Sequence, residues 1–306
     1  MHLALLGLDI GPGDEVIVPT LTYIATANAV LYVGAKPIFI DSCSDNFNLD
    51  IAQIESKITD RTKAIIAVHL YGEPMPMKVL MALAEKHNLY VVEDAAEAHG
   101  AEVDGQKVGS FGHISTFSFF GNKIVTCGEG GAVLTGDEEM ANRMAKLRSQ
   151  GQSENKRFWH DVVGYNYRMT NLQAAVGVAQ IEMLDWHLAQ RDEISERYDQ
   201  LLEGTERVHA ISSAFNHRRV CWLYPALVDL RPGVTIEKLI DALLENGIET
   251  RPFFYPLHTM EIHRQEGNFP SAVRYNKYGI CLPTWVGLSA TDQEKIVAEL
   301  DEQLQI

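Results

Sequence analysis

The chain of 306 residues exceeds a typical single domain, which predicts a large domain with a smaller one beside it. With 46% hydrophobic residues the chain has ample core, while the lack of an apolar run of about 18 residues argues against a membrane span. A net charge of −15 disfavours nonspecific binding to nucleic acid or anionic membranes.

The amino terminus lacks a basic region followed by an apolar core and a cleavage site, so the cytoplasm is the expected compartment. The cysteines are widely spaced and form no CxxC pair, which indicates reduced, mostly buried thiols rather than a zinc site or disulfide framework. They are Cys43, Cys127, Cys221 and Cys281. The histidines His99, His113 and His160 show no metal-ligand spacing, so no metal site is predicted.

Strand-like and helix-like segments alternate through the first half, which is the pattern of an α/β domain with a largely parallel sheet. Short apolar segments predict strands at 16–19, 36–41, 63–70, 89–94, 113–120 and 131–136. Helical spacing of apolar positions predicts helices at 22–34, 49–58, 77–88 and 137–150. The functional loops should lie at the carboxyl ends of the strands.

A long helix is predicted over residues 170–204, with Thr170 or Asn171 as its cap. The segments that follow predict a strand at 220–230, a helix at 235–247 and a strand at 249–258 that runs into a loop. The last helix is expected to begin near Thr291, where TDQE fits a capping box. We therefore predict two domains, a large one over 1–204 that includes the long helix and a small α+β one over 205–306.

Two motifs place chemically complementary groups after predicted strands. VVEDAAEAHG puts Asp94 at the end of one apolar strand, and STFSFFGNK puts Lys123 just past another. Such a lysine can hold an aldehyde cofactor as a Schiff base, and a carboxylate at the ring nitrogen of pyridoxal 5′-phosphate (PLP) keeps that nitrogen protonated. Taken alone, either residue favours an ordinary reading, with Asp94 as a cap after its strand and Lys123 as a surface lysine, because Asp and Lys are usually solvated. Their joint occurrence favours a PLP site.

Further motifs occur in order along nearly the whole chain. They include GPGDEVIVPTLTYIATANAVLYVGAKPIFID, AVHLYGEPMPM, GSFGHISTFSFFGNK, GEGGAVLT and WHDVVGYNYRMTNLQAAVGVAQIE. On these motifs the sequence resembles the DegT/DnrJ/EryC1/StrS family of PLP-dependent nucleotide-sugar aminotransferases. The resemblance implies an α/β fold of the aspartate aminotransferase type (fold type I), with a mostly parallel sheet in the large domain and a smaller α+β carboxyl-terminal domain.

The resemblance also implies roles for residues around the cofactor. Ser118 matches the serine that hydrogen-bonds the PLP phosphate, and Tyr23 matches the aromatic residue that stacks on the pyridine ring. Glu97 matches a polar position near the phenolic oxygen, where a glutamate has to be protonated or act indirectly. Without the resemblance, Tyr23 is equally well a core tyrosine of the following helix.

Asn166 matches an asparagine that reaches the cofactor phosphate of the neighbouring subunit, which implies a homodimer with a shared active site. Several other residues have the right character for a nucleotide diphosphate and a sugar. They are Trp159, His160, Arg251, Tyr255 and His258. Each of these has an ordinary alternative, such as a surface or core histidine, or an arginine paired with a carboxylate.

The amino terminus departs from the family. Residues 1–16 read as the tail of an amphipathic helix, whereas relatives carry roughly sixty further residues with a small-residue loop that holds the PLP phosphate at that helix's amino terminus. The resemblance therefore leads to the hypothesis that a segment is missing and that this chain binds PLP weakly.

The activity implied by the resemblance is transfer of an amino group from L-glutamate to the 4-keto carbon of a nucleotide-linked 4-keto-6-deoxy sugar, for O-antigen or another surface polysaccharide. The segments FSFFGNK, FWHDVVGYNYRMTN and ETRPFFYPLHTM favour GDP-4-keto-6-deoxymannose as that sugar. The alternatives are a truncated, inactive pseudoenzyme or regulatory protein, and a PLP-dependent sugar dehydratase, whose relatives replace the lysine with histidine. A nicotinamide-dependent oxidoreductase ranks last, because no GxGxxG follows a strand.

Overall fold

A six-stranded sheet forms the centre of the large domain in the computed structural model, which describes residues 1–211 and 215–305. The strand order is β2-β1-β3-β4-β7-β8. Neighbouring strands pair in parallel except for β8, which is antiparallel to β7. The bounds are β1 Glu15–Pro19, β2 Lys36–Ile40, β3 Thr62–Val68, β4 Tyr90–Asp94, β7 Ile114–Ser118 and β8 Gly131–Leu134. The predicted α/β class is confirmed.

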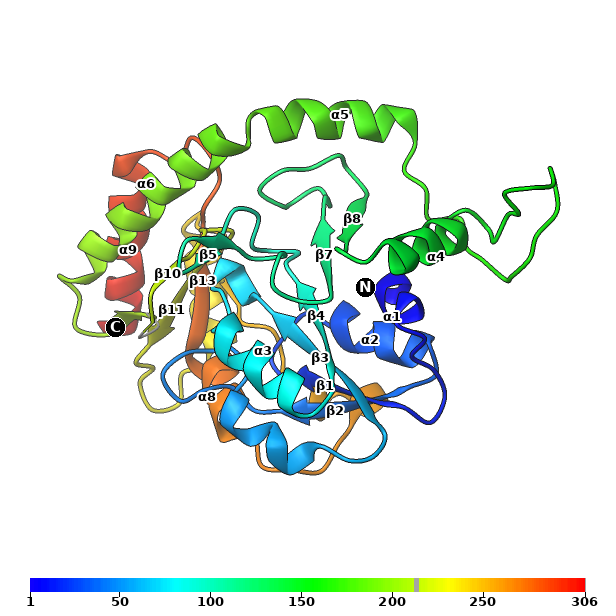
Figure 1. Cartoon of the computed structure of the whole chain (residues 1–306). Helices are drawn as coiled ribbons and strands as arrows, with labels where there is room; N and C mark the ends of the chain where they lie inside the picture. The colour runs from blue at the N-terminus through cyan, green and yellow to red at the C-terminus, as the bar shows by residue number, and fades with distance from the viewer. Residues whose placement is uncertain (212–214, 306) are drawn as a thin grey trace.

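Helices from the first half pack against this sheet because their apolar faces can be buried only there. α1 contacts both α2 and α4 near the amino terminus, while α3 lies against β4 (Figure 1). Their bounds are α1 His2–Gly7, α2 Ala25–Tyr32, α3 Met77–Lys86 and α4 Glu138–Arg148. The strands between them are buried over most of their length, as expected for a sheet covered on both faces.

A second, antiparallel sheet of order β12-β13-β11-β9 has its own hydrophobic core. Its strands are β9 Val208–Ala210, β11 Tyr224–Val228, β12 Arg251–Pro252 and β13 Gly279–Leu282. The helices of this part are α6 Leu184–Leu202, α7 Ile236–Glu245 and α9 Ala290–Gln305. α6 contributes Ile194, Tyr198 and Leu202 to this core, so the helix that leaves the large sheet packs with the smaller one.

Some smaller elements join the two parts. A three-stranded sheet is formed by β10 His217–Arg218, β5 Glu102–Val103 and β6 Gln106–Lys107. Helix α8, Pro270–Tyr278, and the segment after β12 send Phe253 and Tyr275 into the core of the large sheet. No helix within the described ranges is both long and apolar enough to cross a membrane.

The predicted helix at 170–204 is two helices. α5, Asn171–Glu182, ends at Met183, and α6 starts one residue later. The Met183 N–H bonds to the Gln180 carbonyl in a tight terminal turn, and this redirects the chain. At the start of α5 the cap is Thr170, which was one of the two predicted candidates. It forms a capping box with Gln173.

Two other predictions of local structure were wrong in extent. The predicted helix at 49–58 forms only two single 3₁₀ turns, η1 Ile51–Gln53 and η2 Glu55–Lys57. The Asp50 carboxylate takes the Ala52 N–H, and after Leu49 only Ile54 is fully buried in this stretch. The strand expected at 249–258 is limited to Arg251–Pro252, since prolines lack the N–H that a ladder needs.

The last helix begins at Ala290, close to the predicted Thr291, but its cap differs from the prediction. Its first turn is capped by Ser289, whose hydroxyl accepts the Asp292 N–H at 3.1 Å, rather than by Thr291. The Ser289 hydroxyl also donates to the Asp292 carboxylate at 2.6 Å. The cap therefore lies two residues earlier than predicted, with the same serine or threonine chemistry.

Glu93, on β4, is a buried anchor for the loop that leads into β7. Its fully buried carboxylate accepts N–H groups from Gly109, Phe111 and Gly112 at 2.6, 2.8 and 2.6 Å. His69 Nδ1 accepts the Met75 N–H, so its Nε2–H donates to Glu93 at 3.1 Å. Burial alone would raise the pKa of Glu93, but the hydrogen bonds from His69 and the loop amides lower it.

Replacing Glu93 by Gln is expected to lower the free energy of unfolding by about 3 kcal/mol, because an amide cannot accept all of these buried N–H groups. The measurement is urea unfolding of Glu93→Gln beside Glu102→Gln, whose exposed pair with Lys107 should contribute less than about 1 kcal/mol. Since the folded-state pKa of Glu93 is depressed, its contribution is present above the unfolded-state pKa and is lost as pH falls through the folded-state value. Equal stability of Glu93→Gln and the parent at neutral pH would contradict this role.

Candidate active site

Asp94 is the last residue of β4 and its carboxylate is held at the carboxyl edge of the sheet. One oxygen accepts the Thr26 hydroxyl of α2 at 2.8 Å, and the other accepts the Ala96 N–H at 3.3 Å. Register pairs Asp94 with Val68 of β3 on one side and with Thr116 of β7 on the other. The carboxylate is therefore oriented by two neighbours before any ligand binds.

Lys123 lies in the loop that follows β7, the next strand of the sheet. The Lys123 N–H closes a local turn on the Phe120 carbonyl at 3.0 Å. Its side chain is 10% exposed, and Nζ lies 3.4 Å from Glu97 Oε1 and 3.8 Å from the centre of the Trp222 ring. The amine is thus confined between a carboxylate and an aromatic face.

Glu97 follows Asp94 in the turn after β4 and is almost completely buried. Its second oxygen accepts the Tyr71 N–H at 2.8 Å. Tyr71 has a φ of +54°, an unfavourable left-handed conformation for a tyrosine, and in this conformation its N–H donates to Glu97. Burial raises the pKa of Glu97 to about 7, although Lys123 and the Tyr71 amide oppose the shift.

A cavity of about 560 Å³ collects these groups. Its lining includes Asp94, Glu97 and Lys123, together with Tyr23, Ser118 and Arg251. This volume lies in the range of small-molecule pockets, roughly 300–1,000 Å³. These groups have the chemistry that PLP requires. The carboxylate can pair with the ring nitrogen and the lysine can bond to the aldehyde, while the serine hydroxyl and the exposed tyrosine offer further contacts.

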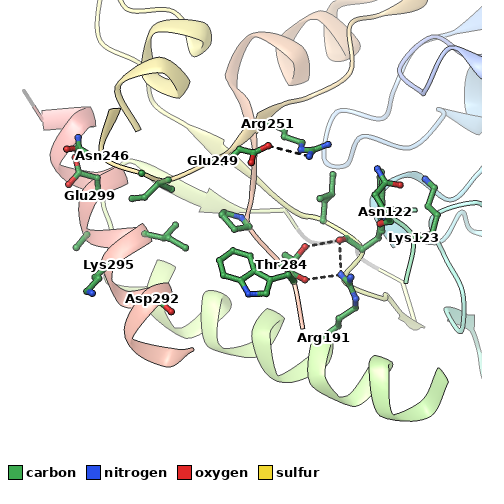
Figure 2. Close-up of a pocket in the computed structure, with 18 of the residues that line it drawn as sticks. Asn122, Lys123, Arg191, Asn246, Glu249, Arg251, Thr284, Asp292, Lys295 and Glu299 are labelled. Atoms are coloured by element: carbon green, nitrogen blue, oxygen red, sulfur yellow. Dashed lines mark hydrogen bonds and ion pairs between the residues drawn. The ribbon is translucent and has the colours of Figure 1, made fainter. Parts of the chain in front are cut away.

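A larger cavity of about 1,100 Å³ adjoins the first and shares Asn122, Lys123, Trp222, Leu223 and Arg251 with it. Figure 2 shows Asn122 and Lys123 at one edge of this cavity, with Lys295 and Asp292 of α9 across from them. Lys123 therefore faces two connected spaces, of which the smaller contains Asp94.

Several predicted site residues are not brought to the cavity that contains Asp94. Of the described residues lining it, none is Asn166, His160, Tyr255 or His258. Asn166, which is exposed, lines another depression beside α1 and β8, which shares Met1, Thr116 and Phe117 with the cavity that contains Asp94.

The predicted substrate residues outside the cavity have different surroundings. His160 lies in an exposed arm, residues 149–169, with Nδ1 2.9 Å from the Gln150 carbonyl oxygen, and the arm extends away from the body in Figure 1. Trp159, in the same arm, is 53% exposed. Tyr255 is exposed at the surface. His258 bonds to the Thr20 hydroxyl at 2.7 Å and stacks on Phe269, which is an ordinary structural setting for a histidine.

Sequence reasoning missed three residues of the site: Thr26, Tyr71 and Trp222. Thr26 had a usable signal, because it lies in the first turn of a helix that starts after β1, where the neighbouring strand ends meet. Tyr71 and Trp222 had none, since both roles come from long-range packing. Among described residues, no group of three or more His, Cys, Asp or Glu is arranged to hold a metal ion.

Taken together, the mixed α/β sheet, the lysine after one strand and the carboxylate at the end of the next define a PLP-dependent enzyme of the aminotransferase class. The chain matches the DegT/DnrJ/EryC1/StrS aminotransferase family over residues 1–301. It belongs to that family, and the resemblance inferred from its motifs is confirmed.

Relatives with stated functions are similar over nearly the whole chain. The chain is 47% identical to the GDP-perosamine synthase of Caulobacter vibrioides over 99% of its own length and 83% of the relative. It is 46% identical to the GDP-perosamine synthase of Escherichia coli O157:H7, over 94% of the chain and 79% of the relative. Among solved structures, DesV of S. venezuelae in complex with a ketimine intermediate superposes with a TM-score of 0.92 at 35% identity, covering 100% of this chain and 82% of that one.

The raised pKa of Glu97 makes the free energy of unfolding depend on pH, and the direction of the shift fixes the sign of that dependence. A carboxyl with a folded-state pKa near 7 instead of 4.5 favours folding below the unfolded-state value, and this contribution is lost as pH rises through about 7. Between about pH 5 and pH 8 the free energy of unfolding of the parent should fall by on the order of 2 kcal/mol relative to that of Glu97→Gln. Urea unfolding of both proteins, freed of cofactor, measures that difference, and a difference independent of pH would contradict it.

Proposed function

We propose that the chain transfers an amino group from L-glutamate to the 4-keto carbon of GDP-4-keto-6-deoxymannose, as in GDP-perosamine synthesis. The observation that carries the chemistry is the convergence of Lys123 and Asp94 on one cavity from adjacent strands. The choice of sugar is supported by relatives named GDP-perosamine synthase, which are 47% and 46% identical to this chain.

The chain's own residues divide the work. PLP, when bound, withdraws electrons from the carbon atom that loses or gains a proton. Lys123 attaches the cofactor covalently and, once released, moves that proton, because its amine is close to the reacting region and confined. Asp94, oriented by Thr26, keeps the ring nitrogen protonated.

Three further residues bind and orient the cofactor in this proposal. Ser118 hydrogen-bonds the phosphate, and Tyr23, 57% exposed at the cavity, offers a ring face for stacking. Glu97, whose pKa is raised to about 7 and which is therefore partly protonated near neutral pH, donates in its protonated form to the phenolic oxygen. Arg251 lines both cavities and is the cationic residue best placed for a phosphate or carboxylate of the substrates.

We also propose a homodimer in which each subunit completes the other's site. No residue of α5 is buried, and Leu172, Val176, Val178 and Ile181 are exposed by 83%, 50%, 58% and 52%. A helix with apolar residues exposed around it needs a partner surface. In Figure 1 α5 crosses the top of the molecule at the outer edge, and the arm beyond α4 also points outward.

A second copy supplies the partner that explains both features. Asn166, Trp159 and His160 lie on or beside the exposed arm and not at their own chain's Lys123. In a two-fold dimer the same arm reaches the other subunit's cavity, where Asn166 meets the phosphate and the two ring side chains meet the nucleotide sugar. Tyr255 and His258 remain candidates for substrate contact only through rearrangement of their loop, because His258 is engaged with Thr20.

Lys123→Ala tests the proposed chemistry. The parent should give a saturable absorption band on titration with PLP, abolished by borohydride and leaving a modified Lys123 peptide by mass spectrometry. The variant should give no band while melting at the parent's temperature. A parent that forms no covalent adduct, or a variant that still does, would contradict the assignment of Lys123.

Mixing two inactive variants tests the shared site. If Lys123 and Asn166 act across the interface, hybrids of Lys123→Ala and Asn166→Ala chains contain one intact site and one doubly defective site. Random mixing should then restore about a quarter of parental activity. Activity no greater than the sum of the separate variants, in samples shown to contain hybrids, would mean that the two residues serve the same subunit's site.

A further inference from the structure

Trp222 makes two contacts with the loop that carries the reactive lysine. It lies before β11 and is buried, and its indole N–H donates to the Asn122 carbonyl at 2.7 Å, across 100 residues of sequence. The face of the same ring lies 3.8 Å from Lys123 Nζ. One side chain thus holds both the backbone beside Lys123 and its amine.

The ring itself is fixed from several directions. The Trp222 carbonyl accepts Arg191 Nη1 at 3.0 Å and the Thr284 hydroxyl at 2.8 Å. The indole is also stacked near Tyr71, with ring centres 6.4 Å apart and planes at 16°. Figure 2 shows Arg191 reaching from α6 toward Thr284 beneath the larger cavity. The aromatic face is consequently a preformed surface.

The position of the Lys123 amine has a chemical meaning because its neighbours are an aromatic face and a carboxylate. A cation over an aromatic face is stabilised, most strongly over tryptophan and where water is excluded. Trp222 and Lys123 both line the wall that the two cavities share. An amine held against the Trp222 ring therefore stays at the edge of the smaller cavity, which contains Asp94. Glu97, at 3.4 Å, is the other partner of the amine in this position.

We propose that the Trp222 ring is the docking position of the Lys123 ammonium whenever the lysine is not attached to the cofactor. Trp222 is then a positioning residue that favours the released lysine. On attachment, the Lys123 ammonium gives one proton to solvent, Nζ bonds to the aldehyde carbon, and its two remaining hydrogens leave with the aldehyde oxygen as water. On release, the nitrogen of an amino donor replaces Nζ at that carbon and passes its two hydrogens to Nζ, which takes a third proton from solvent and returns to the ring as an ammonium. This inference rests on the proposed role of Lys123.

A comparison of two cofactor forms tests it. Pyridoxamine phosphate carries an amine in place of the aldehyde and leaves Lys123 free, so the ring contact is present before and after it binds. PLP attachment gives up that contact. Trp222→Leu should therefore raise the equilibrium constant for covalent PLP attachment about fivefold, while the affinity for pyridoxamine phosphate changes less than about twofold. Trp222→Phe, which retains a ring face but loses the N–H, should stay near the parent.

Two controls complete the experiment. Trp186→Leu removes a half-exposed tryptophan of α6 and should change neither constant. PLP binding to Lys123→Ala, with and without Trp222→Leu, measures the noncovalent part and should be equal in both. A fall in attachment together with weaker pyridoxamine phosphate binding would show a purely structural role and overturn the proposal, as would an unchanged attachment constant in Trp222→Leu. A parent that forms no adduct would instead refute the proposed function itself.

Discussion

The site depends on the parallel pairing of β4 with its neighbours. This pairing places the end of β4 next to the segment that leads from β7 to Lys123, so groups 29 positions apart in the chain face one cavity. Successive side chains of a strand point to opposite faces. Glu93 accordingly holds the loop entering β7 on one face, while Asp94 turns to α2 and the cavity on the other. A structural anchor and the cofactor's proposed partner are adjacent residues of one strand.

Charges around the cavity are buried only where specific partners offset the loss of water. Lys123 has both a carboxylate and an aromatic face, and Glu97 has both the lysine and a backbone N–H. An unpaired charge in such a place would be strongly destabilising. The same partners give the free lysine a defined position. The contacts that stabilise the site therefore also bear on the proposed step in which an amino donor replaces Lys123 at the cofactor.

The local sequence predicted much of the large sheet and the residues at its edge. Asp94 and Lys123 were identifiable because each follows an apolar strand, and strand ends of a parallel sheet meet. The break at Met183 was not predictable, since apolar spacing continues through it. Trp222 was not found because its role comes from contacts 100 residues away. The helix predicted at 49–58 is replaced by 3₁₀ turns, and within 51–58 only Ile54 is fully buried. The roles of Asn166 and His160 stay predictions, because they depend on a second subunit.

The central claim is amino transfer to a keto sugar, and isotope transfer tests it most directly. The protein is incubated with PLP, ¹⁵N-labelled L-glutamate and GDP-4-keto-6-deoxymannose, and the products are examined by mass spectrometry and NMR. The account predicts ¹⁵N at C4 of the sugar, formed by the parent and not by Lys123→Ala. Covalent attachment of PLP at Lys123 without label in the sugar would contradict the proposed substrate, and label transfer by Lys123→Ala would contradict the proposed mechanism.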